Sequence, residues 1–379
     1  MVMSLARGLV ELHSVDGAPD FEVTVVTQMA RANFDDASLP FAVVRQPGFW
    51  KLRHLIRNAD LVHLAGPSFL PMLLAKMAHK PYVVEHHNYQ AICPNGLLIH
   101  MPDRTVCPGH FQARNYGECW KCESAEKSWL HSSLSLLSAF PRRSLVKSAT
   151  GNIAVSQHVQ KRIDMPQTSV VYHGIDFRKA NLENPPARLT AGQKICFAYV
   201  GRFVPDKGIR VFVEALLNLT KQGIDFEAML IGDGPERPSI EEQIKAEGLQ
   251  SVVALTGFLS GESFSSALSR VHVVVMPSIG EETAGLAGIE QMMNGVFVIY
   301  AQIGGLPEVI GDGGLSFSPG NSTELAARMK SVIDNPALIE EIGARARTRA
   351  RQKFALSIMV QKHAAIYRTV RKPEPKQGQ

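Results

Sequence analysis

The sequence predicts an α/β protein made of two doubly wound domains. Its 379 residues exceed what one ordinary hydrophobic core accommodates, and two domains of about 150 to 200 residues are the expectation. Short apolar runs rich in Val, Ile and Phe alternate with longer helical patterns along the chain. Such continuous apolar runs are typical of parallel strands that helices cover on both faces.

The predicted strands form one set in each half of the chain. They cover residues 21–27, 60–66, 81–85, 152–156 and 169–173 in the front half, and 194–201, 226–232, 252–257, 271–278 and 296–300 in the rear half. Residues 181–192 contain two prolines and no apolar periodicity, which predicts a linker. We therefore expect domains at 1–180 and 193–350 and a polar tail at 371–379. A helix is expected over 351–370, which could pack against the front domain.

The front domain departs from the usual order of a doubly wound domain. Residues 4–13 already have the pattern of its first helix, so the strand and Gly-rich turn that normally precede this helix are absent. In the common 3-2-1-4-5 order that strand is central, and segments 21–27 and 60–66 would face each other across a missing ladder. Either the start lies upstream or the domain is impaired.

Composition and charge exclude several classes of protein. The chain is 45% hydrophobic and 20% charged, which excludes collagen, a coiled coil and wholesale disorder. A net charge of +5 is small for this length and argues against a nucleic-acid binder, including one built on a zinc-bound cysteine cluster. The sequence has neither a bilayer-spanning apolar stretch nor a secretory signal, so we expect a cytoplasmic protein.

The first chemical motif follows the strand predicted at 194–201. Gly201-Arg-Phe-Val-Pro-Asp-Lys-Gly208 places two cations, Arg202 and Lys207, near the start of a predicted helix. Helix N-termini favour anions, and a planar guanidinium beside a mobile ammonium suits a diphosphate. The alternative is a solvated loop that happens to carry two cations.

The second motif, Pro277 to Glu290, again runs from a strand through a turn of small residues into a helix. Its carboxylates, Glu282 and Glu290, would lie about 12 Å apart if most of the interval between them is helical. They could then grip both ends of an extended nucleotide-sugar, while the amides of residues 284–287 hold a phosphate. The alternative is an ordinary acidic first turn of a helix.

These motifs together resemble a known family. Gly-Arg-x4-Lys-Gly, then residues 231–235, then 256–258, and finally Pro-Ser-x3-Glu-x7-Glu are similar in order and spacing to the C-terminal domain of retaining glycosyltransferases of family 4. Residues 60–63, 83–89, 154–156 and 171–176 extend the resemblance over nearly the whole chain. It implies the GT-B fold, in which two Rossmann-like domains face each other across a deep cleft.

The resemblance also implies roles for individual residues. Arg202 and Lys207 would neutralise the donor diphosphate, Glu290 would bond the ribose, and Glu282 would hold the transferred sugar. His87 would face that sugar, which makes His87 and Glu282 the candidate catalytic residues. The other implied donor-binding positions are Gly232, Phe258, Gly285 and Leu286. Three departures from the family pattern stand out: Ala284 where Phe is common, His173 where Asn is common, and the missing Gly-rich loop.

The implied reaction is transfer of a sugar from a UDP- or GDP-linked donor to a glycan or lipid-linked acceptor, with retained configuration, in cell-surface polysaccharide or glycolipid synthesis. No Asp-x-Asp triplet occurs in the sequence, which favours the metal-independent architecture, with no cofactor required for catalysis. The alternative is a catalytically impaired nucleotide-sugar-binding or scaffold protein, because the first strand and the Gly-rich loop are absent.

Two further segments carry hypotheses of their own. Cys93, Cys107, Cys119 and Cys122 lie in an irregular insertion at 93–122, where four thiolates could bind a structural zinc; free thiols or a labile disulfide are the alternatives. Residues 129–137 are mostly apolar and are followed by Arg142, Arg143 and Lys147, a pattern that fits peripheral contact with the inner face of a membrane. A core helix with a solvated basic end is the alternative.

Overall fold

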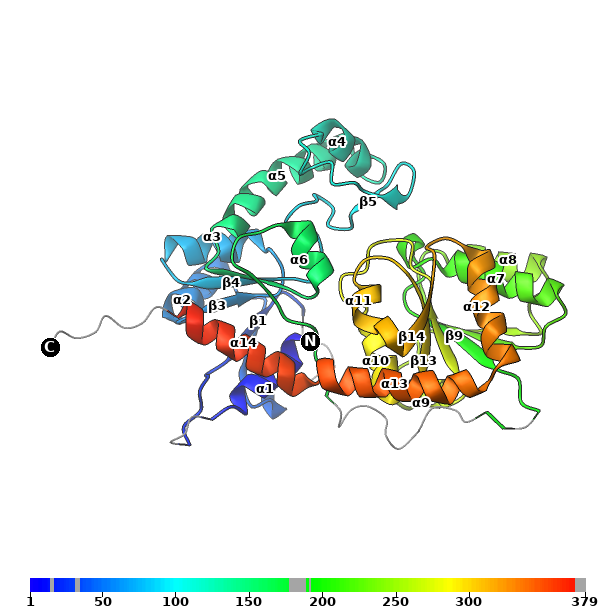
Figure 1. Cartoon of the computed structure of the whole chain (residues 1–379). Coiled ribbons are helices and arrows are strands. Elements are labelled where there is room, and N and C mark those ends of the chain that lie inside the picture. The colour runs from blue at the N-terminus through cyan, green and yellow to red at the C-terminus, as the bar shows by residue number, and fades with distance from the viewer. Residues whose placement is uncertain (14–16, 31–34, 177–188, 191, 372–379) are drawn as a thin grey trace. The chain divides into compact units, whose positions relative to one another are not determined.

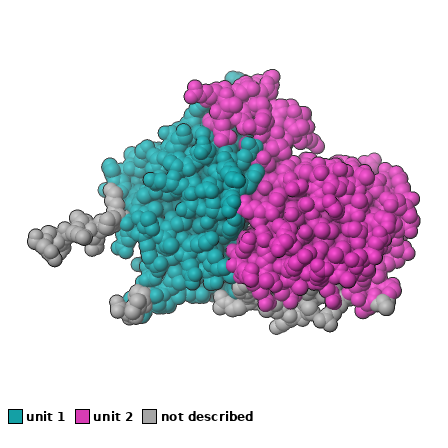
Figure 2. All heavy atoms as spheres, viewed as in Figure 1, with its two compact units in different colours: residues 1–96, 127–176, 355–379 teal, residues 97–126, 177–354 magenta. Residues whose placement is uncertain are grey.

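The computed structural model describes residues 1–13, 17–30, 35–176, 189–190 and 192–371. The chain divides into two compact units (Figure 2). Unit 1 comprises Met1–Gly96, Lys127–Asp176 and Ala355–Gln379, and unit 2 comprises Leu97–Glu126 and Phe177–Phe354. Among the described helices, none combines the length and the apolarity that crossing a bilayer requires.

Unit 2 contains one six-stranded parallel sheet in the order β11-β10-β9-β12-β13-β14 (Figure 1). Its strands are β9 (Cys196–Val200), β10 (Glu227–Ile231), β11 (Val253–Gly257), β12 (Val273–Met276), β13 (Phe297–Ala301) and β14 (Gly314–Phe317). Nearly every residue of β9, β12 and β13 is buried, as expected for a sheet covered on both faces. This arrangement confirms the predicted fold class for the rear half, although β14 was not among the predicted strands.

The helices of unit 2 follow the strands as crossovers. Helices α7 and α12 pack together and supply apolar side chains to the main core, while α10 packs against α13. The bounds are α7 (Ile209–Lys221), α8 (Arg237–Ala246), α9 (Gly261–Leu268), α10 (Leu286–Asn294), α11 (Leu306–Ile310), α12 (Ser322–Asp334) and α13 (Ala337–Lys353), with short 3-10 turns η2 (Pro205–Lys207) and η3 (Gly311–Gly313).

The cysteine-bearing insertion folds mostly with unit 2. It contains the antiparallel pair β5 (Ile99–His100) and β6 (Thr105–Val106), followed by α4 (Tyr116–Ser124). A Cβ placed on Gly280 would come within 2.9 Å of the Ile99 side chain, so the pair packs directly on the loop that follows β12. The sequence predicts this insertion as part of domain 1–180, whereas the structure places residues 97–126 in unit 2.

Unit 1 contains two separate parallel sheets. Strand β1 (Thr24–Thr27) pairs with β2 (Ala42–Arg45), and a second sheet has the order β3-β4-β7-β8, formed by Val62–Leu64, Tyr82–His86, Gly151–Ala154 and Thr168–Val170. Within the described residues, β1 and β3 therefore share no ladder. This agrees with the gap that the sequence predicts between segments 21–27 and 60–66.

The two ends of unit 1 pack on each other. Helix α1 (Val2–Val10) lies against α14 (Leu356–Val370), and Leu5, Leu9 and Tyr367 share one apolar cluster with the β3-β4-β7-β8 sheet (Figure 1). The helix predicted over 351–370 is thus interrupted at Phe354 and Ala355, and its second part belongs to unit 1. The other helices are η1 (Asp36–Ser38), α2 (Phe49–Asn58), α3 (Phe69–Met77), α5 (Trp129–Lys147) and α6 (Gln157–Ile163).

Two sequence predictions fall partly outside the described residues. Of the predicted linker at 181–192, the structure describes only 189, 190 and 192. Of the tail at 371–379, it describes only residue 371. The boundary expected at 350 falls instead at 354, where α13 ends.

Candidate active site

The two motifs of the rear half meet at the point where the strand order of unit 2 reverses. Strands β9 and β12 are neighbours, but the chain leaves β9 toward β10 and leaves β12 toward β13 on the opposite side. In open parallel sheets, ligands bind outside the carboxyl ends of strands at such a point. The loops after the two strands are joined there, because the amides of Ile279 and Gly280 each donate to the carbonyl of Asp206 at 3.0 Å.

Two glycines let these loops approach each other. Gly208 has φ +65°, and a Cβ at this position would lie 1.9 Å from the Pro277 carbonyl oxygen. Gly232 has φ +142°, and a Cβ there would lie 1.8 Å from the carbonyl oxygen of Gly201. Only glycine fits such contacts. Gly232, a predicted donor-binding position, therefore has a structural role in holding the β9 and β10 loops together.

Lys207 and Glu282, which come from different motifs, are in direct contact. The Lys207 Nζ lies 2.7 Å from Glu282 Oε1, and the Ser278 hydroxyl donates to the same oxygen at 2.8 Å. Asp206 contributes a second carboxylate 3.5 Å from Nζ. The side chains of Lys207 and Glu282 are 26% and 14% exposed, so a bound ligand can reach both.

Arg202 lies in the same neighbourhood. Its side chain is exposed and forms no ion pair with any of the residues that the structure describes, while its carbonyl accepts a hydrogen bond from the Tyr199 hydroxyl at 2.6 Å. Burial raises the pKa of the Tyr199 phenol, the charges of Glu282 and Asp206 raise it further, and Arg202 lowers it. These charged groups therefore surround the end of β9 together.

The start of α10 adds unpaired amide groups. Gly285 precedes the helix with φ +57°, and no side chain caps it, so the first N–H groups from Leu286 onward have no partner inside the helix. The carbonyl of Glu282 accepts from the Gly305 amide at 2.7 Å, which fixes the preceding turn. Because α10 begins only at Leu286, the separation of about 12 Å expected for a mostly helical interval does not apply to Glu282 and Glu290.

Glu290 and Phe258 complete the positions predicted in unit 2. Glu290 lies on α10 and is an exposed residue, and desolvation by the surrounding protein raises the pKa of its carboxyl. Phe258 follows β11 with 79% of its surface exposed. It lies next to the strand end that carries Gly232, because the Gly232 amide donates to the carbonyl of Gly257 at 2.9 Å.

His87 belongs to unit 1 and directly follows β4. Its Nε2 lies 3.3 Å from Glu85 Oε2, and its Nδ1 lies 3.4 Å from His173 Nε2, with the two imidazole rings stacked 5.1 Å apart. Burial lowers the pKa of His173 to about 4. The neighbouring His86 faces the other way and bonds to Asn152 at 2.9 Å, as expected for a structural residue, and burial lowers its pKa to about 4.

The residue around which this part of unit 1 is organised was not among the predicted site residues. Glu85 is 4% exposed and is surrounded by the imidazoles of His63, His87 and His363. Burial raises the pKa of its carboxyl, but these imidazoles more than offset this effect and hold the pKa well below the usual range. The available signal was a carboxylate inside the otherwise apolar run Tyr82-Val-Val-Glu85.

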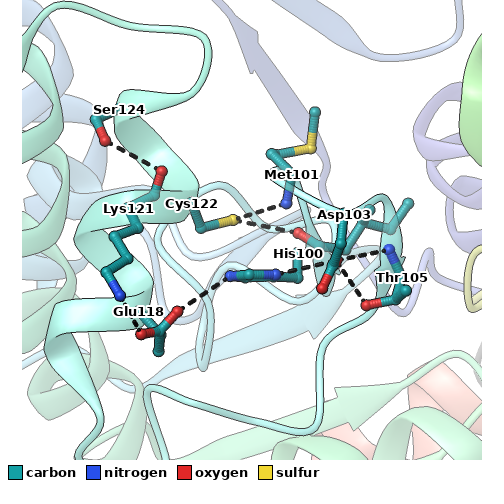
Figure 3. Close-up of polar contacts among 9 residues, drawn as sticks. His100, Met101, Asp103, Thr105, Glu118, Lys121, Cys122 and Ser124 are labelled. Atoms are coloured by element: carbon teal, nitrogen blue, oxygen red, sulfur yellow. Dashed lines mark hydrogen bonds and ion pairs between the residues drawn. The ribbon is translucent and has the colours of Figure 1, made fainter.

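The four insertion cysteines are buried. Figure 3 shows the Cys122 thiol beside the amide of Met101, 3.3 Å away, and His100 between the carboxylates of Asp103 and Glu118. Groups of side chains with the spacing of metal ligands surround Glu85 and include no thiol, among the described residues. Zinc bound by Cys93, Cys107, Cys119 and Cys122 therefore stays a prediction.

Comparison with known proteins agrees with this geometry. Residues 182–349 match the model of the family described as glycosyl transferases group 1. The chain is 34% identical over 174 residues to an alpha-D-kanosaminyltransferase and 36% identical over 141 residues to a 2-deoxystreptamine glucosyltransferase, both from Streptomyces kanamyceticus. These alignments cover 45% and 37% of this chain, and they span only 45% and 36% of the length of the two relatives.

Solved structures are similar over nearly the whole chain. A glycosyltransferase from Rickettsia africae superposes with a TM-score of 0.71 at 18% identity, covering 98% of this chain and 94% of its own. Anabaena Alr3699/HepE in complex with UDP and glucose superposes with a TM-score of 0.68 at 20% identity, covering 97% and 95%. Residues 182–349 are thus similar to the glycosyl transferases group 1 family, and the chain has the GT-B fold with two parallel-sheet Rossmann-like domains.

Proposed function

We propose that this protein is a glycosyltransferase that moves a sugar from a nucleoside-diphosphate donor to an acceptor with retained configuration. The observation that carries the proposal is the contact between Lys207 and Glu282, at 2.7 Å, where the strand order of unit 2 reverses. A cation and a carboxylate held together at that point match the two parts of the donor that lie on either side of the reacting bond, the diphosphate and the hydroxyl-bearing sugar.

The chemical task of the site is to stabilise the departing diphosphate. Lys207, Arg202 and the first amides of α10 supply positive potential at fixed positions. Before the donor binds, Glu282 neutralises Lys207. When the donor binds, its diphosphate pairs with Lys207 in place of Glu282. The Glu282 carboxylate then accepts a hydrogen bond from a hydroxyl of the sugar.

The proposed mechanism needs no carboxylate nucleophile and no metal in the reaction. Glu282 is held by Lys207 and Ser278, and Glu290 lies on a different element, so the two carboxylates do not form the acid and nucleophile pair of a glycosidase. We infer that the acceptor attacks from the face of the leaving group. A phosphate oxygen of the diphosphate then accepts the acceptor's proton, and His87 contacts the transferred sugar.

A UDP-linked hexose is the first donor to test, and a GDP-linked one the second. Support for UDP comes from the complex of the structurally similar Alr3699/HepE with UDP and glucose. Support for a hexose comes from relatives named as glucosyl and kanosaminyl transferases. For the acceptor we propose a glycan or a lipid-linked sugar, which agrees with an exposed apolar surface on unit 1.

That surface lies on α5, and α2 carries a further exposed aromatic side chain. Trp129, Leu134 and Leu137 on α5 are 70%, 55% and 63% exposed, and Trp50 on α2 is 75% exposed, with Arg53 over its ring at 6.0 Å. The apolar side chains of 129–137 therefore do not form the predicted alternative of a core helix, whereas Ala139, Leu145 and Val146 further along α5 are buried. Exposed aromatic and aliphatic side chains next to basic ones are typical of a surface that enters the headgroup region of an anionic membrane.

Co-sedimentation with liposomes tests the membrane contact. The wild type should bind vesicles that contain an anionic lipid, and Leu134→Ser combined with Leu137→Ser should abolish binding without changing thermal stability. The matched control is Met77→Ser, which removes a comparably exposed side chain from α3. Equal binding by the wild type and the double variant would exclude α5 as the contact.

The proposed function is tested by nucleotide binding followed by turnover. UDP at 100 times its Kd should stabilise the fold by about 2.7 kcal/mol, a thermal shift of several degrees, with GDP and ADP as comparison nucleotides. Incubation with the UDP-hexose and a candidate acceptor should then release UDP. Absence of any shift with all three nucleotides would contradict the proposal.

One observation favours a second candidate function, a nucleotide-sugar-binding protein without turnover. In the described part of unit 1, β1 and β3 belong to separate sheets rather than to one continuous sheet. The same two measurements distinguish the candidates, because a protein of this kind would show the thermal shift with a nucleotide but release no diphosphate from any acceptor mixture.

A further inference from the structure

Unit 1 encloses a carboxylate with an unusual set of neighbours. The Glu85 side chain is 5% exposed, and among the described residues it is paired with imidazoles and with no Lys or Arg. His63 Nε2 lies 3.1 Å from Oε2, and His363 Nε2 lies 3.6 Å from Oε1. The three residues come from β3, β4 and α14, three elements of one unit.

The tautomer of His363 determines what can lie between it and Glu85. His363 is fully buried, and its Nδ1 lies 2.9 Å from the carbonyl oxygen of Met359, one turn earlier on α14. A carbonyl only accepts, so Nδ1 must carry a proton. In the neutral ring of His363, Nε2 then carries no proton, and its lone pair faces a carboxylate oxygen of Glu85. Two acceptors face each other, and a positive species between them would remove their repulsion.

His63 is held in a similar way. Its Nδ1 lies 2.9 Å from the hydroxyl of the buried Tyr367, on the side opposite to Glu85. A second partner that fixes the far nitrogen of the ring is the usual arrangement for a histidine that binds a metal through its other nitrogen. Both histidines therefore direct Nε2 toward the same carboxylate from rings that are fixed from behind.

We propose that Glu85, His63 and His363 bind a divalent metal ion, with Zn²⁺ as the probe that their chemistry favours. Two imidazoles and one carboxylate form a ligand set used for zinc, with ligand distances of about 2.0–2.2 Å. Tetrahedral bonds of that length place neighbouring ligand atoms about 3.3 Å apart. The observed separations of 3.1 and 3.6 Å bracket this value, and all three ligand atoms lie within 4.8 Å of one another.

The ion would be structural. It would join β3, β4 and α14 directly behind His87, whose Nε2 is 3.3 Å from the same carboxylate, and no step of sugar transfer would pass through it. The competing explanation for the geometry is a proton, which would make His363 a buried imidazolium that donates to Glu85. Metal content distinguishes the two without any measurement of glycosyl transfer, so this inference and the proposed function can fail separately.

The test is the zinc content and zinc coordination of the full chain, purified without a histidine tag. The protein is stripped with a chelator, dialysed against Zn²⁺ and analysed by mass spectrometry for metals and by X-ray absorption at the zinc edge. We expect zinc bound by nitrogen and oxygen at about 2.0–2.2 Å. Because the insertion cysteines are an independent candidate, the measurement is repeated on Cys119→Ser combined with Cys122→Ser, which should keep this nitrogen and oxygen signal.

Two substitutions then test the assignment of the ligands. His363→Phe and Glu85→Gln should each lower the zinc affinity at least tenfold. The matched control, His86→Gln, removes an equally buried histidine from the adjacent position of β4 and should leave binding unchanged. If a ligand variant fails to fold, the absorption spectrum of the wild type still decides. Wild-type protein without zinc bound by nitrogen and oxygen, or such zinc retained by both folded ligand variants, would overturn the proposal and leave the buried imidazolium.

Discussion

Replacing Lys207 by Met is the most direct perturbation of the proposed site, because it removes the charge and keeps most of the side-chain volume. At about 4 Å from a phosphate charge, an ammonium contributes about 4 kcal/mol before desolvation, at the effective dielectric constant of about 20 found near protein surfaces. Removal of a single donor that stabilises developing negative charge typically costs about 10²–10³ in kcat. We therefore expect kcat/KM to fall by about 10²–10³.

The assay is release of the nucleoside diphosphate at varied donor concentration, in parallel with calorimetric binding of the nucleotide alone. The matched control is Lys194→Met, which removes the same group from an exposed ion pair with Asp225 in the same unit and should change kcat/KM less than twofold. Thermal unfolding checks that Lys207→Met remains folded with Glu282 unpaired. If Lys207→Met changes kcat/KM less than threefold, Lys207 does not stabilise the diphosphate.

Further perturbations test the geometry at other positions. Glu290→Gln should weaken nucleotide binding by about 10- to 100-fold in calorimetry, since hydrogen bonds to a charged group contribute about 1.5–3 kcal/mol; unchanged affinity would remove Glu290 from the donor site. Gly208→Ala should lower the free energy of unfolding by about 3 kcal/mol or more in urea, because its Cβ would meet the Pro277 carbonyl at 1.9 Å, whereas Gly223→Ala, with a similar φ of +69° and open space around it, should cost only about 1 kcal/mol. The pKa of His86 is about 4 in the folded protein and about 6.5 in the unfolded chain. Because the unfolded chain binds the proton at the higher pH, the free energy of unfolding falls as the pH drops from 6.5 to 4. His86→Gln should lose up to about 3 kcal/mol of this pH dependence in unfolding curves, and an unaltered pH dependence would show that His86 does not cause it.

The strands of unit 2 could be predicted because their signal is local. Strands β9, β12 and β13 are continuous apolar runs, and such runs arise from burial on both faces of a parallel sheet. The approach of the two motifs could be expected on the same ground, since β9 and β12 are parallel and their loops leave the sheet at the same edge. Strand β14 was missed because Gly314-Leu-Ser-Phe317 contains only two apolar side chains.

The side-chain contacts within the site could not be predicted from spacing. Lys207 and Glu282 are 75 residues apart, and their ion pair depends on how the Asp206 carbonyl aligns one loop on the other. The estimate for a mostly helical interval between Glu282 and Glu290 does not apply, because Gly285 adopts a left-handed conformation and the helix begins only after it. Local patterns predict that a helix forms, but its first residue depends on such backbone details.

The sequence by itself determined the fold class, the family resemblance and the positions of the charged motifs, because each is carried by residues close together in the chain. Only the tertiary structure decided that residues 97–126 pack with unit 2, that α5 exposes its apolar side chains, and that Glu85 lies among histidines from three elements. His63 and His363 are 300 residues apart, and their meeting depends on the packing of α14 in unit 1. Contacts of that kind follow from the shape of the whole core, which no local periodicity records.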